Sequence, residues 1–77
     1  MATGYVLINV EPGSEFSVYK SIGQFDQVAD STLLFGDYDL IAKVVADNMA
    51  SIAQFVVEEI RQIEGVQNTK TLAGAEV

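Results

Sequence analysis

The sequence predicts one α+β domain whose elements follow the order strand, helix, strand, strand, helix, strand. Four segments show β-branched runs or alternation of apolar and polar residues, both typical of strands. Two further segments carry apolar residues at three- and four-residue spacing, which is typical of amphipathic helices. With 77 residues and no repeat, linker or low-complexity stretch, the chain is expected to form a single domain over residues 1–77.

The first part of the chain is expected to supply a strand and a short helix. Residues 4–10 are Gly-Tyr-Val-Leu-Ile-Asn-Val, and Glu11-Pro12-Gly13 after them favours a turn, so a first strand is predicted. Ser14 is a candidate N-cap for the helix that follows. At helical spacing, the apolar face of this helix is expected to hold Phe16, Tyr19, Ile22 and Gly23.

A hairpin is predicted in the middle of the chain. Residues 26–35 begin polar and end in Thr-Leu-Leu-Phe, and residues 40–45 are apolar except for Lys43. Between them lies Gly36-Asp37-Tyr38-Asp39, a composition that favours a turn. We therefore expect two strands joined by a glycine-containing turn.

The second helix and the last strand are expected in the final third of the chain. Asp47 or Asn48 is a candidate cap, and Gly65 is expected to end the helix. Its apolar positions recur at helical spacing: Met49, Ile52, Phe55, Val56, Ile60 and Ile63. Its solvated face is expected to carry Gln54, Glu58, Arg61 and Gln62. Residues 66–72 alternate apolar and polar residues, which predicts a fourth strand.

Composition excludes several classes of function. Four Lys and Arg residues against eleven Asp and Glu residues give a net charge of −7, which repels a phosphate backbone, so we expect no direct binding of nucleic acid. The basic residues are scattered and the apolar runs are far too short to span a bilayer, so we expect no membrane contact and a cytoplasmic protein. Because cysteine and histidine are absent, thiolate metal sites are excluded, and no metal or cofactor is expected.

The predicted architecture leaves one face of the sheet without helices. Right-handed crossovers in this order place both helices on the same face of a four-stranded antiparallel sheet. The first strand is nevertheless apolar on both sides, since Val6, Ile8 and Val10 alternate with Tyr5 and Leu7. We therefore expect a second copy of the chain to cover the helix-free face. The alternative is that loops beside the helices shield it.

Three blocks of sequence carry a resemblance to a known family. Residues 4–13 (Gly-Tyr-Val-Leu-Ile-Asn-Val-Glu-Pro-Gly), 36–40 (Gly-Asp-Tyr-Asp-Leu) and 63–72 (Ile-Glu-Gly-Val-Gln-Asn-Thr-Lys-Thr-Leu) together resemble the C-terminal effector-binding (RAM) domain of the Lrp/AsnC regulators. The likeness implies a ferredoxin-like fold and homodimers that pair through their sheets and assemble into rings of eight or ten subunits. The chain has no room for the DNA-binding domain of those regulators, and it is similar to stand-alone members. We therefore expect it to modulate transcription by mixing with full-length Lrp/AsnC regulators.

The resemblance also implies a small amino-acid effector, bound between dimers near the central turn. Carried over to this sequence, the ligand-binding residues are Gly36, Asp37, Tyr38, Asp39, Thr69 and Thr71. Gly36 can direct backbone N–H groups at a carboxylate, and Asp37 or Asp39 can accept from an ammonium group. The plainer interpretation is a hairpin turn, with Tyr38 as a packing residue and the two threonines as ordinary strand residues.

Catalysis has little support in the sequence, so we expect no enzyme. Without histidine or cysteine, a general base would have to be a carboxylate or a lysine, and turn and helix-surface roles explain the adjacent acidic pairs Asp37/Asp39 and Glu58/Glu59. Three alternatives remain open. They are an ACT-like amino-acid-binding module, a small ferredoxin-like enzyme of the dimeric monooxygenase or dehydratase type with a pocket between sheet and helices, and a structural oligomer without a ligand.

Overall fold

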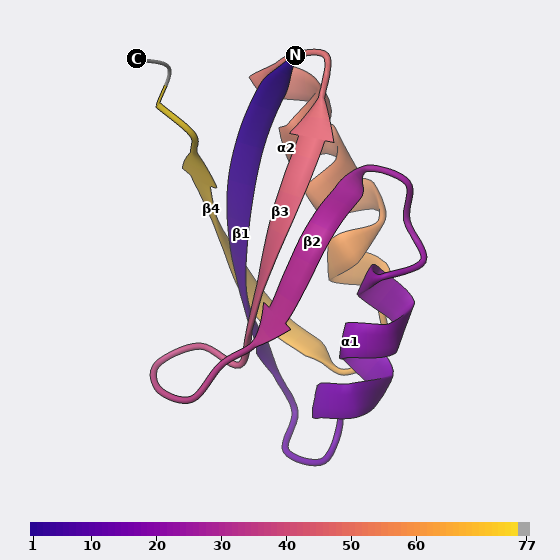
Figure 1. The fold of residues 1–77 in the computed structure, drawn as a ribbon. Helices are drawn as coiled ribbons and strands as arrows, with labels where there is room; N and C mark the ends of the chain where they lie inside the picture. The colour runs from indigo at the N-terminus through magenta and orange to yellow at the C-terminus, as the bar shows by residue number, and fades with distance from the viewer. Residues whose placement is uncertain (76–77) are drawn as a thin grey trace.

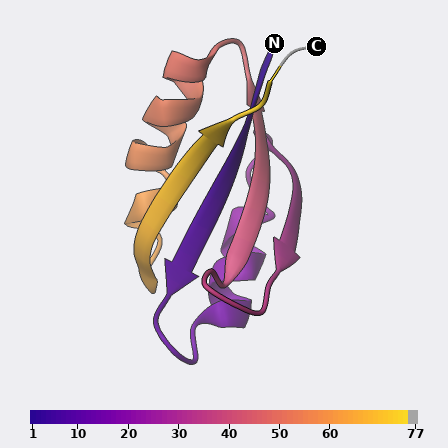
Figure 2. The ribbon, with the colours of Figure 1, turned by 90° about the vertical axis from the view of Figure 1, so that its left-hand side faces the viewer.

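The computed structural model describes residues 1–75 and has the predicted order of elements (Figure 1). They are β1 (Ala2–Val10), α1 (Glu15–Ile22), β2 (Val28–Leu33), β3 (Leu40–Ala46), α2 (Met49–Glu58), the 3₁₀ turn η1 (Ile60–Gln62) and β4 (Val66–Ala73). The strands form one antiparallel sheet in the order β2-β3-β1-β4. Both helices cover the same face of this sheet, as Figures 1 and 2 show. The predicted βαββαβ sandwich is confirmed.

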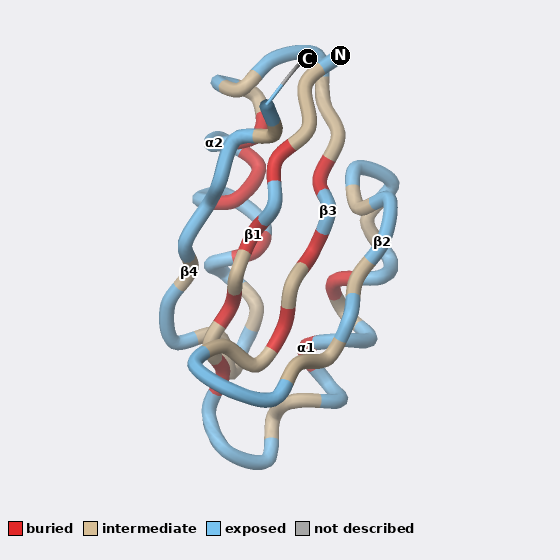
Figure 3. Tube along the Cα trace, turned by 60° about the vertical axis from the view of Figure 1, so that its left-hand side comes forward, coloured by how far each residue is buried: buried red, intermediate tan, exposed pale blue. Residues whose placement is uncertain are grey.

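The core lies between the two central strands and the helices. Along β1 and β3 every second residue is buried, and Figure 3 shows this alternation on the central strands but hardly at all on β2 and β4. The strands contribute Val6, Ile8, Val10, Leu40, Ala42 and Val44 to the core. The helical side contributes Val18, Ile22, Ile52, Phe55, Val56 and Ile60. The edge strands therefore extend the sheet without adding much to its core.

The apolar face predicted for α1 is wrong in part. Ile22 is buried as expected, but Phe16 is 77% exposed and Tyr19 is 38% exposed. The residue that joins Ile22 in the core is Val18, four positions earlier and therefore on the same side of the helix. Gly23 follows the helix as its C-cap and is exposed. As a result, α1 presents aromatic side chains to the surface.

The second helix begins as predicted but ends earlier. Asn48 is its cap, since its side-chain oxygen accepts a 2.8 Å hydrogen bond from the backbone N–H of Ser51. The α-helix stops at Glu58, and the tighter turn of η1 follows instead of a continuous helix up to Gly65. This turn keeps Ile60 fully buried while the chain reverses towards β4. Gly65 has a φ of +100° and makes that reversal possible.

The helix-free face of the sheet carries mostly apolar residues along its two central strands, with the exposed Lys43 among them on β3, and polar residues towards its edges. The register places Leu7 beside Ile41 and Tyr5 beside Leu72 on this face, and Tyr5 and Leu72 are 37% and 45% exposed. Polar residues share the face at the edges: Asp30 and Thr32 on β2, Asn68 and Lys70 on β4. In Figure 2 the β2–β3 loop passes in front of the lower part of this face and leaves the upper part open. Loops therefore shield it only in part.

Candidate functional site

The loop between β2 and β3, residues 34–39, is fixed to the sheet by Asp39. Its backbone N–H donates a 2.9 Å hydrogen bond to the carbonyl of Ile8, and its carbonyl accepts one of 2.9 Å from the N–H of Leu34. Its carboxylate accepts a 2.8 Å hydrogen bond from the N–H of Val10. The pairing of β1 with β3 ends at Ile8 and Leu40, so Asp39 supplies the acceptor for Val10 that β3 does not. This structural role was not foreseen.

The tip of the loop offers unpaired donors. Gly36 has a φ of +133°, a conformation that favours glycine, and a Cβ atom there would meet no atom within 4 Å. Within residues 1–75, no protein acceptor receives the backbone N–H of Phe35, Gly36, Asp37 or Tyr38. These four consecutive N–H groups therefore make no hydrogen bond to the described protein, and main-chain donors of this kind can bind an anion without any lysine or arginine.

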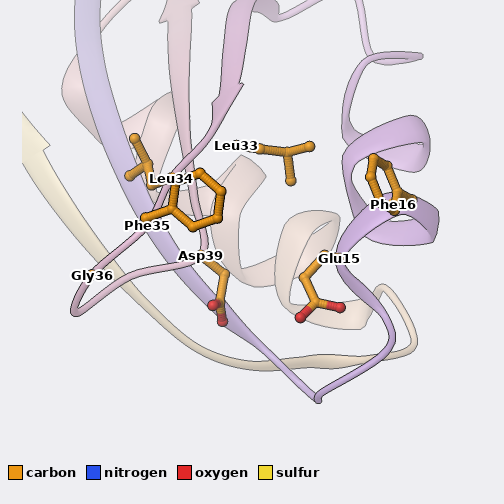
Figure 4. A pocket seen from close by; sticks show the side chains of 7 residues that line it. All are labelled: Glu15, Phe16, Leu33, Leu34, Phe35, Gly36 and Asp39. Atoms are coloured by element: carbon orange, nitrogen blue, oxygen red, sulfur yellow. The ribbon is translucent and has the colours of Figure 1, made fainter.

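A hollow of about 450 Å³ lies between this loop and the start of α1 (Figure 4). Four apolar residues, two acidic residues and one glycine line it: Phe16, Leu33, Leu34, Phe35, Glu15, Asp39 and Gly36. Figure 4 shows the two carboxylates pointing the same way along one rim, with Leu33 and the aromatic rings around the rest of the hollow. The lining contains no basic side chain. A hollow of this kind suits a ligand with a cationic group and an apolar part.

Glu15 is held in place in the same manner as Asp39. One carboxylate oxygen of Glu15 accepts a 2.9 Å hydrogen bond from the backbone N–H of Gly13. In the same way, one carboxylate oxygen of Asp39 accepts a hydrogen bond from the backbone N–H of Val10. Each acid therefore keeps one oxygen that makes no hydrogen bond within the described residues. The hollow opens to solvent, because Phe16 and Phe35 are 77% and 108% exposed.

The structure brings together only some of the predicted ligand residues. Gly36 and Asp39 line the hollow, while Asp37 and Tyr38 lie in the same loop outside its lining. The two threonines lie on β4, where Thr69 pairs with Ile8 and Thr71 with Val6, so their side chains share the helix-covered side of the sheet. Thr69 is separated from Leu40 by β1, about 10 Å across two strand spacings. Within one chain, the threonines and the loop do not form one pocket.

Sequence reasoning missed the contribution of α1 to this site. Phe16 was expected in the core, and no role was expected for Glu15 or Phe35. One feature of the sequence could have indicated it: Val18 and Ile22 are a second apolar pair at helical spacing. If this pair is placed in the core, Phe16 is predicted on the surface. The hollow forms between the start of α1 and the β2–β3 loop, which are about twenty residues apart in the sequence, so no local sequence pattern predicts it.

Comparison with known proteins identifies the family. The family model described as the Lrp/AsnC ligand binding domain matches residues 3–73, which covers every element from β1 to β4. The chain belongs to the Lrp/AsnC ligand-binding domain family. This match confirms the resemblance seen in the sequence. It favours the Lrp/AsnC family over the ACT-like module that was considered as an alternative.

Relatives of this Lrp/AsnC domain share both its sequence and its fold. An uncharacterised HTH-type transcriptional regulator of Pyrococcus horikoshii is 33% identical over 73 residues, covering 91% of the chain and 49% of the regulator. The chain thus spans about half the length of the regulators that it matches. A crystal structure from Thermus thermophilus is 30% identical with a TM-score of 0.93, covering 100% of this chain and 96% of that one. These matches confirm the ferredoxin-like Lrp/AsnC fold.

A more distant structure carries a ligand. The complex of a Neisseria meningitidis transcriptional regulator with L-Met has a TM-score of 0.86 at 14% identity, covering 97% of this chain and 50% of that one. At this identity the likeness shows the common fold.

Three further observations bear on the remaining classes of function. Among the residues described, no polar or charged side chain is buried between sheet and helices, which is where the enzyme alternative requires a titratable group. The matched relatives are transcriptional regulators, as expected from the resemblance. No helix within residues 1–75 is long and apolar enough to cross a membrane.

Proposed function

We propose that this domain binds a free amino acid at the β2–β3 loop and senses it within a cytoplasmic assembly of copies, without catalysing a reaction. The observation that carries the proposal is the loop itself: Asp39 anchors it, Gly36 shapes its tip, and four consecutive N–H groups there have no protein acceptor. The family assignment and the L-Met complex of the distant relative support an amino acid as the ligand class.

The ligand carboxylate is expected to accept from the loop N–H groups, and its ammonium group is expected to face acidic side chains. Asp39 has one oxygen free for this purpose, and Asp37 is exposed in the same loop. Since Thr69 and Thr71 lie two strands from the loop base, their hydroxyls can reach the ligand only from a neighbouring copy. A site between copies would explain why a single chain holds only part of it.

Assembly is the second part of the proposal. The helix-free face presents the apolar residues Tyr5, Leu7, Ile41, Val45 and Leu72 around the exposed Lys43, and pairing of two such faces would remove this apolar surface from water. We expect these dimers to associate further, into rings of eight or ten subunits, with ligand sites between dimers. Mixed assemblies with full-length Lrp/AsnC regulators would connect ligand binding to transcription.

Thermal unfolding in the presence of each of the twenty amino acids tests ligand binding. A ligand present at 100 times its dissociation constant stabilises the folded state by about 2.7 kcal/mol. For a domain of this size, that corresponds to a rise in Tm of roughly 10–20 °C. If no amino acid at millimolar concentration shifts Tm, the sensing role is wrong and the structural oligomer without a ligand is the remaining function.

A pair of glycine variants tests the position of the site. Gly36→Val is expected to abolish the ligand-induced shift, because the side chain disturbs the N–H groups at the loop tip. Gly23→Val is the control for an added valine side chain, since Gly23 is exposed after α1, a Cβ atom there makes only ordinary contacts, and the residue lies outside the hollow. A shift that survives in Gly36→Val would remove the loop from the site.

A further inference from the structure

We infer that the ligand is an amino acid with a basic side chain, of the lysine or arginine type. This inference rests on the proposed function and names its ligand class. It comes from the charge of the hollow, which holds the carboxylates of Glu15 and Asp39 and no basic side chain in its lining. A basic amino acid, with a net charge of +1, would offset one of these two negative charges, whereas a neutral amino acid would offset neither and an acidic one would add a third.

Each of the two carboxylates can pair with one cationic group of such a ligand, which carries an α-ammonium group and a side-chain cation. Asp39 stands at the loop, next to the N–H groups that would receive the ligand carboxylate, so it faces the α-ammonium group. Glu15 stands at the start of α1, beside Asp39 along the same rim of the hollow (Figure 4), so we assign it to the side-chain cation. Both acids are held by backbone N–H groups, at 2.8 Å for Asp39 and 2.9 Å for Glu15, and little side-chain freedom is lost when a ligand binds.

The apolar part of the hollow fits the rest of a basic amino acid. In Figure 4 Leu33 lies between the rings of Phe16 and Phe35, above the rim that carries the two carboxylates, and it offers apolar surface to the methylene chain of lysine or arginine. Phe16 and Phe35 present exposed rings at the two sides, and aromatic faces attract ammonium and guanidinium groups. A volume of about 450 Å³ is ample for a long side chain.

Matched ligand pairs test the inference by isothermal titration. Lysine against norleucine and arginine against citrulline differ in the side-chain charge while keeping nearly the same length. We expect each basic ligand to bind about fivefold more tightly than its neutral partner, as a partly exposed ion pair allows. This preference should fall as salt rises, because salt screens the additional ion pair that the side-chain cation makes with Glu15.

A variant pair assigns the preference to Glu15. Glu15→Gln keeps an oxygen for the N–H of Gly13 but removes the charge, and it should bring lysine and norleucine to equal affinity. Glu64→Gln makes the same change in net charge outside the hollow and should retain the preference. The salt dependence of the unmodified protein gives an independent answer if Glu15→Gln does not fold.

The outcomes separate this inference from the proposed function. If norleucine or leucine binds the unmodified protein as tightly as lysine, the ligand class is wrong while amino-acid sensing stands. An undiminished lysine preference in Glu15→Gln also overturns the assignment. If none of these amino acids binds, both the ligand class and the sensing role fall.

Discussion

The Asp39→Ala substitution should destabilise the domain strongly, because it removes the acceptor of the 2.8 Å hydrogen bond from the N–H of Val10. Val10 is only 4% exposed, so water cannot readily replace the lost carboxylate. A hydrogen bond to a charged group contributes about 1.5–3 kcal/mol, and we expect a loss of about 2 kcal/mol in the free energy of unfolding. For a domain of this size that lowers Tm by roughly 8–16 °C.

Two companion variants make this prediction specific. Asp39→Asn keeps a side-chain oxygen for the N–H of Val10 and should lose about 1 kcal/mol or less. Asp37→Ala removes an exposed carboxylate from the same loop and should change stability by no more than about 0.5 kcal/mol. Chemical and thermal unfolding at one protein concentration measure all three, since association would otherwise change Tm. If Asp39→Ala and Asp37→Ala lose the same stability, Asp39 does not anchor the loop.

Three further predictions test the interface, the core and the cap of α2. Ile41→Glu should lower the assembly mass measured by size-exclusion chromatography, because it places a charge on the helix-free face. The control Val57→Glu changes a residue on α2 that is 52% exposed, and it should leave the mass unchanged. If the two variants have equal masses, the helix-free face is not the interface. Val18→Ala should lower the free energy of unfolding, measured in urea, by about 2 kcal/mol, because Val18 is buried. Phe16→Ala should lower it by no more than about 0.5 kcal/mol, because Phe16 is exposed. A larger loss for Phe16→Ala than for Val18→Ala would show that Phe16 belongs to the core. Asn48→Ala should cost about 1 kcal/mol in thermal unfolding, and no loss would place the cap elsewhere.

The sequence was sufficient for the architecture where one physical signal dominated. In β1 and β3 the strands are buried on the helix side and mostly apolar on the other, apart from Asn9 and Lys43, so the sequence showed long apolar runs. In α2 the apolar stripe covers several turns, and a single capping residue fixes the start. Such elements are determined by local spacing and need no knowledge of their neighbours.

Prediction failed where two local solutions were nearly equal. In the eight residues of α1, Phe16 with Tyr19 and Val18 with Ile22 both have helical spacing, and only packing against the sheet selects the second pair. Tertiary packing also decides where α2 ends: the helix stops at Glu58 because the turn back to β4 must keep Ile60 buried. Helical spacing alone cannot show where tertiary packing shortens a helix.

The candidate site was predictable only as a segment. Glycine and aspartate marked residues 36–39 as a turn, but the spacing could not show that Asp39 bonds to Val10 while Asp37 remains exposed. The contribution of Glu15 and Phe16 depends on how α1 lies against the loop, which is a property of the folded chain. The positions of Thr69 and Thr71 relative to the loop likewise follow from the strand order.

Light scattering on the purified protein at micromolar concentration tests most directly whether the domain is completed by copies of itself. We expect a particle mass that is a multiple of 8.3 kDa, starting from the dimer and stable on dilution through the micromolar range. A mass of 8.3 kDa throughout that range would show that the helix-free face stays in water, and it would contradict both the assembly and a ligand site between copies.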